Sequence, residues 1–250
     1  MLLNKLKNKK AFTLAEVLIT LAIIGIVAAM TIPSVVNSTN NSEIVAKVKK
    51  YQSVFSQVYL KATNDNGCLG DLSSCGAFSV TGQDPTAPWA FFKPYLNVIK
   101  DCGTSTGCYN PGVSYKSLNY AVSGTSTIND NVNIFSKAVL ADGAFIFLYK
   151  ESAANCSTNG SVSTNTTGPL YNSVCGSFYV DVNGAKGPNQ EGRDEFSYVI
   201  AKTGIYPAGM DGTIYAGCNP SSGDVTADDS GAPGVGYCTA RILKEGAINY

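Results

Sequence analysis

The chain has 250 residues, with 18 Lys and Arg, 18 Asp and Glu, and no His. This length can bury a sizeable hydrophobic core, and the 44% hydrophobic content excludes a disordered chain. The absence of His excludes every Ser-His-Asp triad, every Cys-His dyad and every zinc site with His ligands. Zero formal net charge and only 14% charged residues argue against a nucleic-acid-binding protein.

The charges are unevenly distributed along the chain. Residues 1–11 carry four lysines (Lys5, Lys7, Lys9 and Lys10) and no acid. The remaining residues carry 14 basic and 18 acidic groups, so their formal charge is −4. A basic head that precedes an apolar run and a mildly acidic body is typical of an exported protein.

The apolar run is long enough to cross a membrane. No charged residue occurs from Val17 to Ser42, and Val17 to Val36 is almost entirely apolar. Twenty helical residues rise about 30 Å, the thickness of the hydrocarbon layer. The lysines before the run predict that the C-terminal body faces away from the cytoplasm. A buried core helix is one alternative, and a secretory signal peptide cut after Ala29 is another. Glu16 and the apolar residues beyond Ala29 argue against the signal peptide.

The sequence from Lys9 to Ile19 (KKAFTLAEVLI) resembles the prepilin signature of type IV pilins and type II secretion pseudopilins. The resemblance implies that residues 1–11 are a leader, which a prepilin peptidase removes between Ala11 and Phe12 before methylating the new amine. Glu16 matches the hallmark acid of the family. The family usually has Gly before the cut, and we expect Ala11 to permit processing because it is the smallest substitute.

A carboxylate inside an apolar segment needs a partner. The family's assembly mechanism implies that Glu16 of one subunit neutralises the Phe12 amine of a neighbour, because a paired buried charge is tolerated where a single one is not. The alternative is that Glu16 caps its own helix, since a carboxylate in the first turn satisfies free N–H groups and suits the helix dipole.

Helical periodicity resumes after the polar residues 37–42. Apolar residues recur at helical spacing and form one stripe: Ile44, Val48, Tyr51, Phe55, Val58 and Ala62. We therefore expect an N-terminal helix over residues 12–62, whose part 12–36 spans the membrane or forms the filament core. Pro33 predicts a soft segment before Ser42.

Residues 63–250 are expected to form a β-rich extracytoplasmic domain. The sequence predicts a short helix around residues 88–92 that resumes toward Ile99, a hairpin over 138–149, and strands over 177–182 and 196–201. The fold class is α+β: a long N-terminal helix packed on a C-terminal antiparallel sheet with disulfide-stapled loops. This is also the fold that the resemblance implies.

All eight cysteines lie in this domain, and export makes disulfides the expected state. Proximity in the sequence suggests the pairs Cys68–Cys75, Cys102–Cys108, Cys156–Cys175 and Cys218–Cys238. Zinc is a weaker interpretation, because no CxxC spacing occurs.

The segment 181–194 concentrates side-chain oxygens between two predicted strands. Asp181, Asn183, Asn189 and Asp194 are candidate calcium ligands, because calcium prefers six to eight oxygens. Major pseudopilins bind calcium in a loop of the β-region, so the resemblance also favours this cofactor. The alternative is a turn held by the hydrogen bonds of Asx side chains.

The expected function is a structural subunit, not an enzyme: a pilin or pseudopilin, major or minor, of a type IV pilus or a type II secretion pseudopilus. Its expected partners are other pilin subunits, the prepilin peptidase, the inner-membrane assembly platform and membrane lipid, without nucleic acid. It would span the inner membrane once before entering a periplasmic pseudopilus or a surface pilus.

One alternative is a membrane-tethered binding or adhesion module, whose contact patch would contain exposed aromatics: Trp89, Tyr109, Tyr206 and Tyr237. A carboxylate-based hydrolase is a third hypothesis, but no motif fixes a pair of acids at a defined separation.

Overall fold

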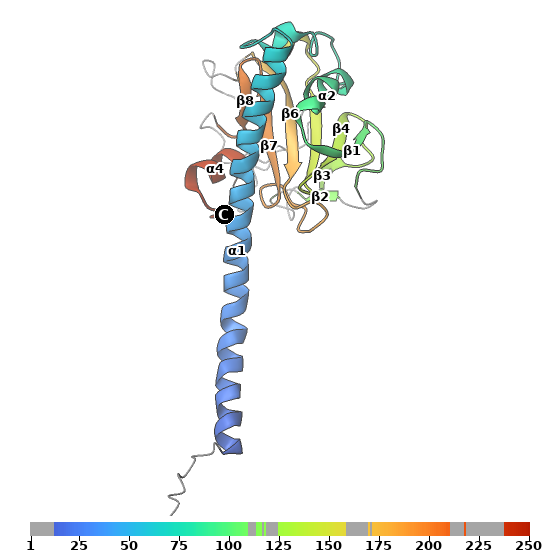
Figure 1. Ribbon diagram of the computed structural model, residues 1–250. Helices are drawn as coiled ribbons and strands as arrows, with labels where there is room; N and C mark the ends of the chain where they lie inside the picture. Colours follow the sequence, from blue (N-terminus) through green and yellow to red (C-terminus); the bar gives the residue numbers. More distant parts are fainter. Residues whose placement is uncertain are drawn as a thin grey trace, which may run out of the picture. The chain divides into compact units, whose positions relative to one another are not determined.

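The computed structural model describes residues 13–109, 114–116, 118, 125–158, 170, 172–210, 218 and 238–250 (Figure 1). The chain falls into two compact units, Met1–Ser42 and Glu43–Tyr250. Helix α1 (Leu14–Asp65) contributes residues to both units. The predicted leader and Phe12 lie outside the described residues.

The first unit contains the apolar half of helix α1. Its stretch Leu14–Pro33 has a mean hydropathy of 2.3, and none of it is buried inside the protein. In the described part of the chain, this is the one helix long and apolar enough to cross a membrane. The hydroxyls of Thr20 and Thr31 donate to the carbonyls of Val17 and Val27 at 2.9 and 3.0 Å, so neither is left unpaired in apolar surroundings.

Helix α1 continues through Pro33 and the polar residues 37–42, so the predicted soft segment does not interrupt it. Proline removes one backbone donor from a helix and can be accommodated as a local disturbance.

The second unit is built on a six-stranded antiparallel sheet with the strand order β1-β4-β5-β6-β7-β8. Its strands are β1 (Val98–Gly103), β4 (Phe135–Leu140), β5 (Phe145–Lys150), β6 (Val174–Asp181), β7 (Glu195–Ala201) and β8 (Gly204–Pro207). A separate ribbon pairs β2 (Ser114–Lys116) with β3 (Thr125–Asn129). The short helical elements are η1 (Leu72–Cys75), α2 (Thr86–Phe92), η2 (Lys93–Tyr95), η3 (Ala154–Cys156) and α4 (Cys238–Glu245).

The second half of α1 packs one stripe against this sheet. Val48, Phe55 and Ala62 are fully buried, as the periodicity predicted. The ring of Phe55 stacks on that of Phe178 in β6 with centroids 4.7 Å apart. Tyr198 in β7 donates its hydroxyl to the carbonyl of Val48 at 2.8 Å. The α+β architecture predicted from the sequence is therefore confirmed.

The other face of the sheet carries a second, aromatic core. Alternate residues of β5 and β6 point to opposite faces of the sheet. The residues that face away from α1 join aromatics from β2 and the segment after β1 in one buried cluster: Tyr109, Tyr115, Phe135, Phe145, Phe147, Tyr149 and Tyr179. Both faces of the central strands are thus covered, which explains why every residue of β5 and β6 is buried.

The local strand predictions are confirmed at β4–β5, β6 and β7. The β4–β5 hairpin turns at Asp142 and Gly143, and the φ of 86° at Gly143 is one that a glycine adopts without strain. The predicted helix around residues 88–92 is confirmed as α2, but its continuation toward Ile99 is wrong. After η2, which includes Pro94, the chain becomes edge strand β1 and pairs with β4. Helix α4 was not predicted.

The eight cysteines form four disulfides: Cys68–Cys75, Cys102–Cys108, Cys156–Cys175 and Cys218–Cys238. These are the pairs that proximity in the sequence suggested. With all eight paired, no thiolate remains for the zinc interpretation.

Candidate functional site

The first turn of α1 is closed by a capping box between Thr13 and Glu16. The Thr13 backbone N–H and its hydroxyl both donate to Oε2 of Glu16 at 2.8 Å. The Glu16 N–H donates in return to the Thr13 hydroxyl oxygen at 3.2 Å. This reciprocal arrangement satisfies donors that a helix N-terminus otherwise leaves unpaired, and it explains why α1 begins at Leu14.

The capping box uses only one oxygen of the carboxylate. No described residue donates to Oε1 of Glu16, and the Glu16 side chain is exposed. The prediction that Glu16 caps its own helix is confirmed. Its pairing with the amine of Phe12 stays a prediction, because Ala11 and Phe12 lie outside the described residues. Sequence reasoning missed Thr13, although the Thr-x-x-Glu spacing was a sufficient signal.

The surface of the first unit beyond Glu16 is apolar all round. Leu18, Ile24 and Met30 leave more than half of their surfaces exposed, in a stretch without any charged residue. A contiguous apolar surface of this extent indicates lipid or other apolar helices as its natural surroundings.

The loop between β6 and β7 brings the four predicted calcium ligands together. Oδ1 of Asp181 accepts the N–H of Asn183 at 3.0 Å. Asp194 accepts the N–H of Asn189 at 2.8 Å and, with its other oxygen, that of Gln190 at 2.6 Å. The Asn183 amide also donates to Asp194, at 3.4 Å. These are the hydrogen bonds expected of an Asx-stabilised turn.

The second oxygen of Asp181 accepts the Tyr115 hydroxyl at 2.6 Å, so it is also engaged. Among the described residues, no group of three or more His, Cys, Asp or Glu side chains is arranged to hold a metal ion. The turn interpretation therefore has direct support, and calcium binding stays a prediction.

Two further acids, which sequence reasoning missed, surround this loop. Glu191 and Glu195 are as buried as Asp181 and Asp194. Glu195 lies directly opposite Asp181 in the pairing of β7 with β6, a position in which like charges repel. Only the strand register reveals this pair, so the sequence alone could not.

Burial dominates the ionisation of these carboxyl groups. It raises the pKa of Asp181 to about 7, with the charge of Asp194 adding to the effect and the Tyr115 hydroxyl opposing it. Burial, followed by the charge of Glu191, holds the pKa of Glu195 well above its usual range. The loop is therefore sensitive to protons near neutral pH.

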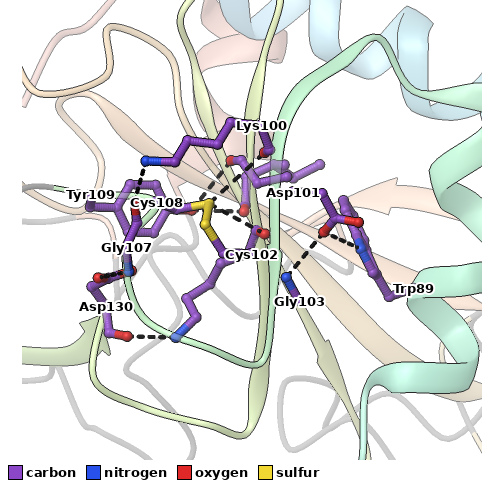
Figure 2. Close-up of a disulfide and its surroundings, with 12 residues drawn as sticks. Trp89, Lys100, Asp101, Cys102, Gly103, Gly107, Cys108, Tyr109 and Asp130 are labelled. Carbon is purple, nitrogen blue, oxygen red and sulfur yellow. Dashed lines mark hydrogen bonds between the residues drawn. A yellow bond between two sulfur atoms is a disulfide. The ribbon is translucent and has the colours of Figure 1, made fainter.

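The aromatic contact patch expected for a tethered binding module is not present as predicted. Trp89 and Tyr109 each expose only 4% of their surfaces, so the expectation that they are exposed is wrong. The Trp89 ring N–H donates to Oδ1 of Asp101 at 3.0 Å, beside the Cys102–Cys108 disulfide (Figure 2). Tyr206 is half-buried, and Tyr237 lies outside the described residues.

Figure 2 shows that several hydrogen bonds join the residues around this disulfide. The N–H of Gly107 donates to Oδ2 of Asp130 at 2.6 Å, and the Lys100 amine donates to the carbonyl of Gly107. Tyr109 donates its hydroxyl to the carbonyl of Ile146 at 2.9 Å. These contacts fasten the segment after β1 to the sheet.

Residues 6–32 match the family described as the prokaryotic N-terminal methylation motif, the prepilin-type cleavage and methylation segment of type IV pilins and pseudopilins. No curated protein matches the chain, and no solved structure does. The match contains Ala11, Phe12 and the capping-box residues Thr13 and Glu16. It marks the chain as a pilin-like precursor, and it implies processing by a prepilin peptidase and assembly with other pilin subunits. Together with one apolar helix near the N-terminus, it fits a precursor anchored in the inner membrane.

Proposed function

We propose that this protein is a structural subunit, a pilin or pseudopilin, of a type IV pilus or a type II secretion pseudopilus. The observation that carries the proposal is the methylation motif at residues 6–32, which lies over the start of an apolar, unburied helix. A subunit of this class acts by assembly and needs no catalytic residues of its own.

The geometry of Glu16 supports assembly through the N-terminal helix. Oε2 accepts both hydrogen bonds from Thr13, whereas no described residue donates to Oε1. Cleavage between Ala11 and Phe12 creates a cationic amine at Phe12. In a bundle of apolar helices, the free oxygen of one subunit then neutralises the amine of its neighbour, which removes the penalty of two isolated charges.

The apolar half of α1 supports the same function in two environments. Before assembly, the stretch Leu14–Pro33 is long enough to cross the bilayer. After assembly, the same side chains pack against those of neighbouring subunits, and the second unit forms the outer part of the filament. The body therefore stays outside the cytoplasm throughout.

The decisive experiment is mass spectrometry of filaments isolated from the native cells. We expect to find this chain in them, beginning with N-methylated Phe12 and lacking the lysines of the leader. A mature N-terminus at Met30, or a chain that keeps its leader in the exported form, would contradict the proposal. Shearing filaments from the cell surface, in comparison with the periplasmic fraction, distinguishes a pilus from a pseudopilus.

A further inference from the structure

Four lysines lie close to the beginning of the second unit, where helix α1 enters it from the apolar stretch. Lys47, Lys49 and Lys50 lie within one turn of α1, and Lys186 lies in the loop between β6 and β7. Lys47, and more weakly Lys186, lowers the pKa of Glu43, so the two segments share one electrostatic environment. We refer to these four lysines as the basic end.

Contacts inside the second unit hold the two segments together. The Lys50 amine donates to the carboxylate of Asp142 in the β4–β5 turn. Gly184 of the β6–β7 loop lies so close to that turn that an added Cβ would come within 2.5 Å of the carbonyl oxygen of Gly143. The helix and the loop therefore present their lysines on neighbouring surfaces of a compact unit.

The four lysines of the basic end outnumber the acids with which they form ion pairs. Lys47 pairs with Glu43 at 2.8 Å, and Lys50 pairs with Asp142. Lys49 and Lys186 are exposed, and neither forms an ion pair with any residue in the described ranges. Residues 12–250 as a whole are net acidic, so this end is opposite in sign to the chain that bears it.

The chain restrains the basic end close to the membrane. Nine residues lie between Pro33, the end of the apolar stretch, and Glu43, the first residue of the second unit, which makes ten steps along the chain. This connection spans about 15 Å as a helix and no more than about 35 Å when fully extended. Anionic headgroups attract the lysines of the basic end and repel the acids that predominate in residues 12–250 as a whole.

We propose that, before assembly, the basic end binds anionic phospholipid headgroups on the side of the membrane where the second unit lies. The inference rests on the proposed function, because it requires that the apolar stretch be inserted in a bilayer. Headgroup phosphates supply the ion-pair partners that Lys49 and Lys186 do not have among the described residues. Binding fixes the orientation of the waiting subunit, and extraction into a filament must break it.

The test uses the mature chain, beginning at Phe12, reconstituted in phosphatidylcholine vesicles with and without phosphatidylglycerol. An amine-reactive reagent labels exposed lysines, and mass spectrometry quantifies each site. We expect phosphatidylglycerol to reduce labelling of Lys49 and Lys186 several-fold, and high salt to restore it, because salt shortens the range of the attraction. Lys61, exposed on the same helix beyond the basic end, is the internal control and should not change.

A matched pair of variants sharpens the test. The double variant Lys49→Gln with Lys186→Gln should lose the lipid-dependent protection of loop amides 183–187, 189 and 190 against hydrogen exchange, whereas Lys61→Gln should keep it. Equal labelling in both lipids would overturn the inference alone. Protection that is the same in both lipids and grows with protein density would also overturn it, since it would indicate a second copy of the chain. Release of the chain by alkaline carbonate would overturn the proposed function as well.

Discussion

The two halves of helix α1 belong to the same element but differ in the surroundings of their apolar side chains. The half in the first unit exposes its large apolar side chains, and the hydrogen bonds of its described polar side chains are local, such as those between Thr13 and Glu16. The half in the second unit buries one stripe against a sheet whose other face is also covered. Four disulfides fasten that unit. The second unit thus holds its own core, whereas the first needs surroundings that other molecules supply.

The largest expected effect comes from removing the acid of the first unit. We predict that Glu16→Ala abolishes filaments without blocking membrane insertion, because the Phe12 amine then has no partner in the apolar bundle. The measurement is the yield of sheared filaments together with the carbonate-resistant membrane fraction. Glu43→Ala, which removes an exposed acid from the same helix, is the matched control and should assemble. Normal filaments from Glu16→Ala would refute the pairing role.

In the second unit, the corresponding weak point is the stacked pair of Phe55 and Phe178. Phe55→Ala should lower the free energy of unfolding by about 3–5 kcal/mol, because it leaves a cavity in a fully buried contact. Denaturant titration followed by the fluorescence of Trp89, the chain's single tryptophan, measures this change. Leu60→Ala, at a position 55% exposed on the same helix, should cost far less. Equal losses from both variants would contradict the packing described for α1.

The stability of the second unit should also depend on pH, through the protonation of a buried carboxyl group. The pKa of Asp181 is raised to about 7 in the folded chain, from an ordinary value of 3.8. A raised pKa contributes stability that is complete below the ordinary value and is lost as the pH rises through 7. In metal-free buffer, the melting temperature should therefore be higher at about pH 5 than at about pH 8.

Asp181→Asn should reduce this pH dependence, since the amide does not titrate. Asp84→Asn, at an exposed position before α2, should leave it unchanged, because the Asn side-chain oxygen can accept the same Thr86 N–H that Oδ1 of Asp84 accepts. An unaltered pH profile in Asp181→Asn would exclude this carboxyl group as its source.

The smallest expected effect concerns calcium. If the oxygens of Asp181, Asn183, Asn189 and Asp194 bind this ion, calcium added to metal-free protein should raise the melting temperature, because a ligand of the native state stabilises it. The rise should be largest at alkaline pH, where the carboxylates are ionised, and absent in Asp194→Asn. Calorimetry with magnesium as the comparison measures it. An unchanged melting temperature would leave the Asx turn as the whole account of this loop.

The sequence predicted the features that depend on neighbouring residues. The stripe through Phe55 follows from helical spacing, the β4–β5 turn follows from Asp142-Gly143, and the disulfides join cysteines close together in the chain. Features that depend on distant contacts were not predictable. The burial of Tyr109 depends on its bond to Ile146, and the opposition of Asp181 and Glu195 depends on the register of β6 with β7.

The capping box gives the two carboxylate oxygens of Glu16 different hydrogen-bonding roles. Oε2 accepts hydrogen bonds from Thr13 of the same chain, so it needs no donor from a neighbouring subunit. In the proposed membrane-anchored monomer, the carboxylate is therefore already held by two hydrogen bonds, although its negative charge is not neutralised until an amine arrives. Under the proposed assembly, a neighbour's amine then meets a carboxylate whose position the start of its own helix has already fixed.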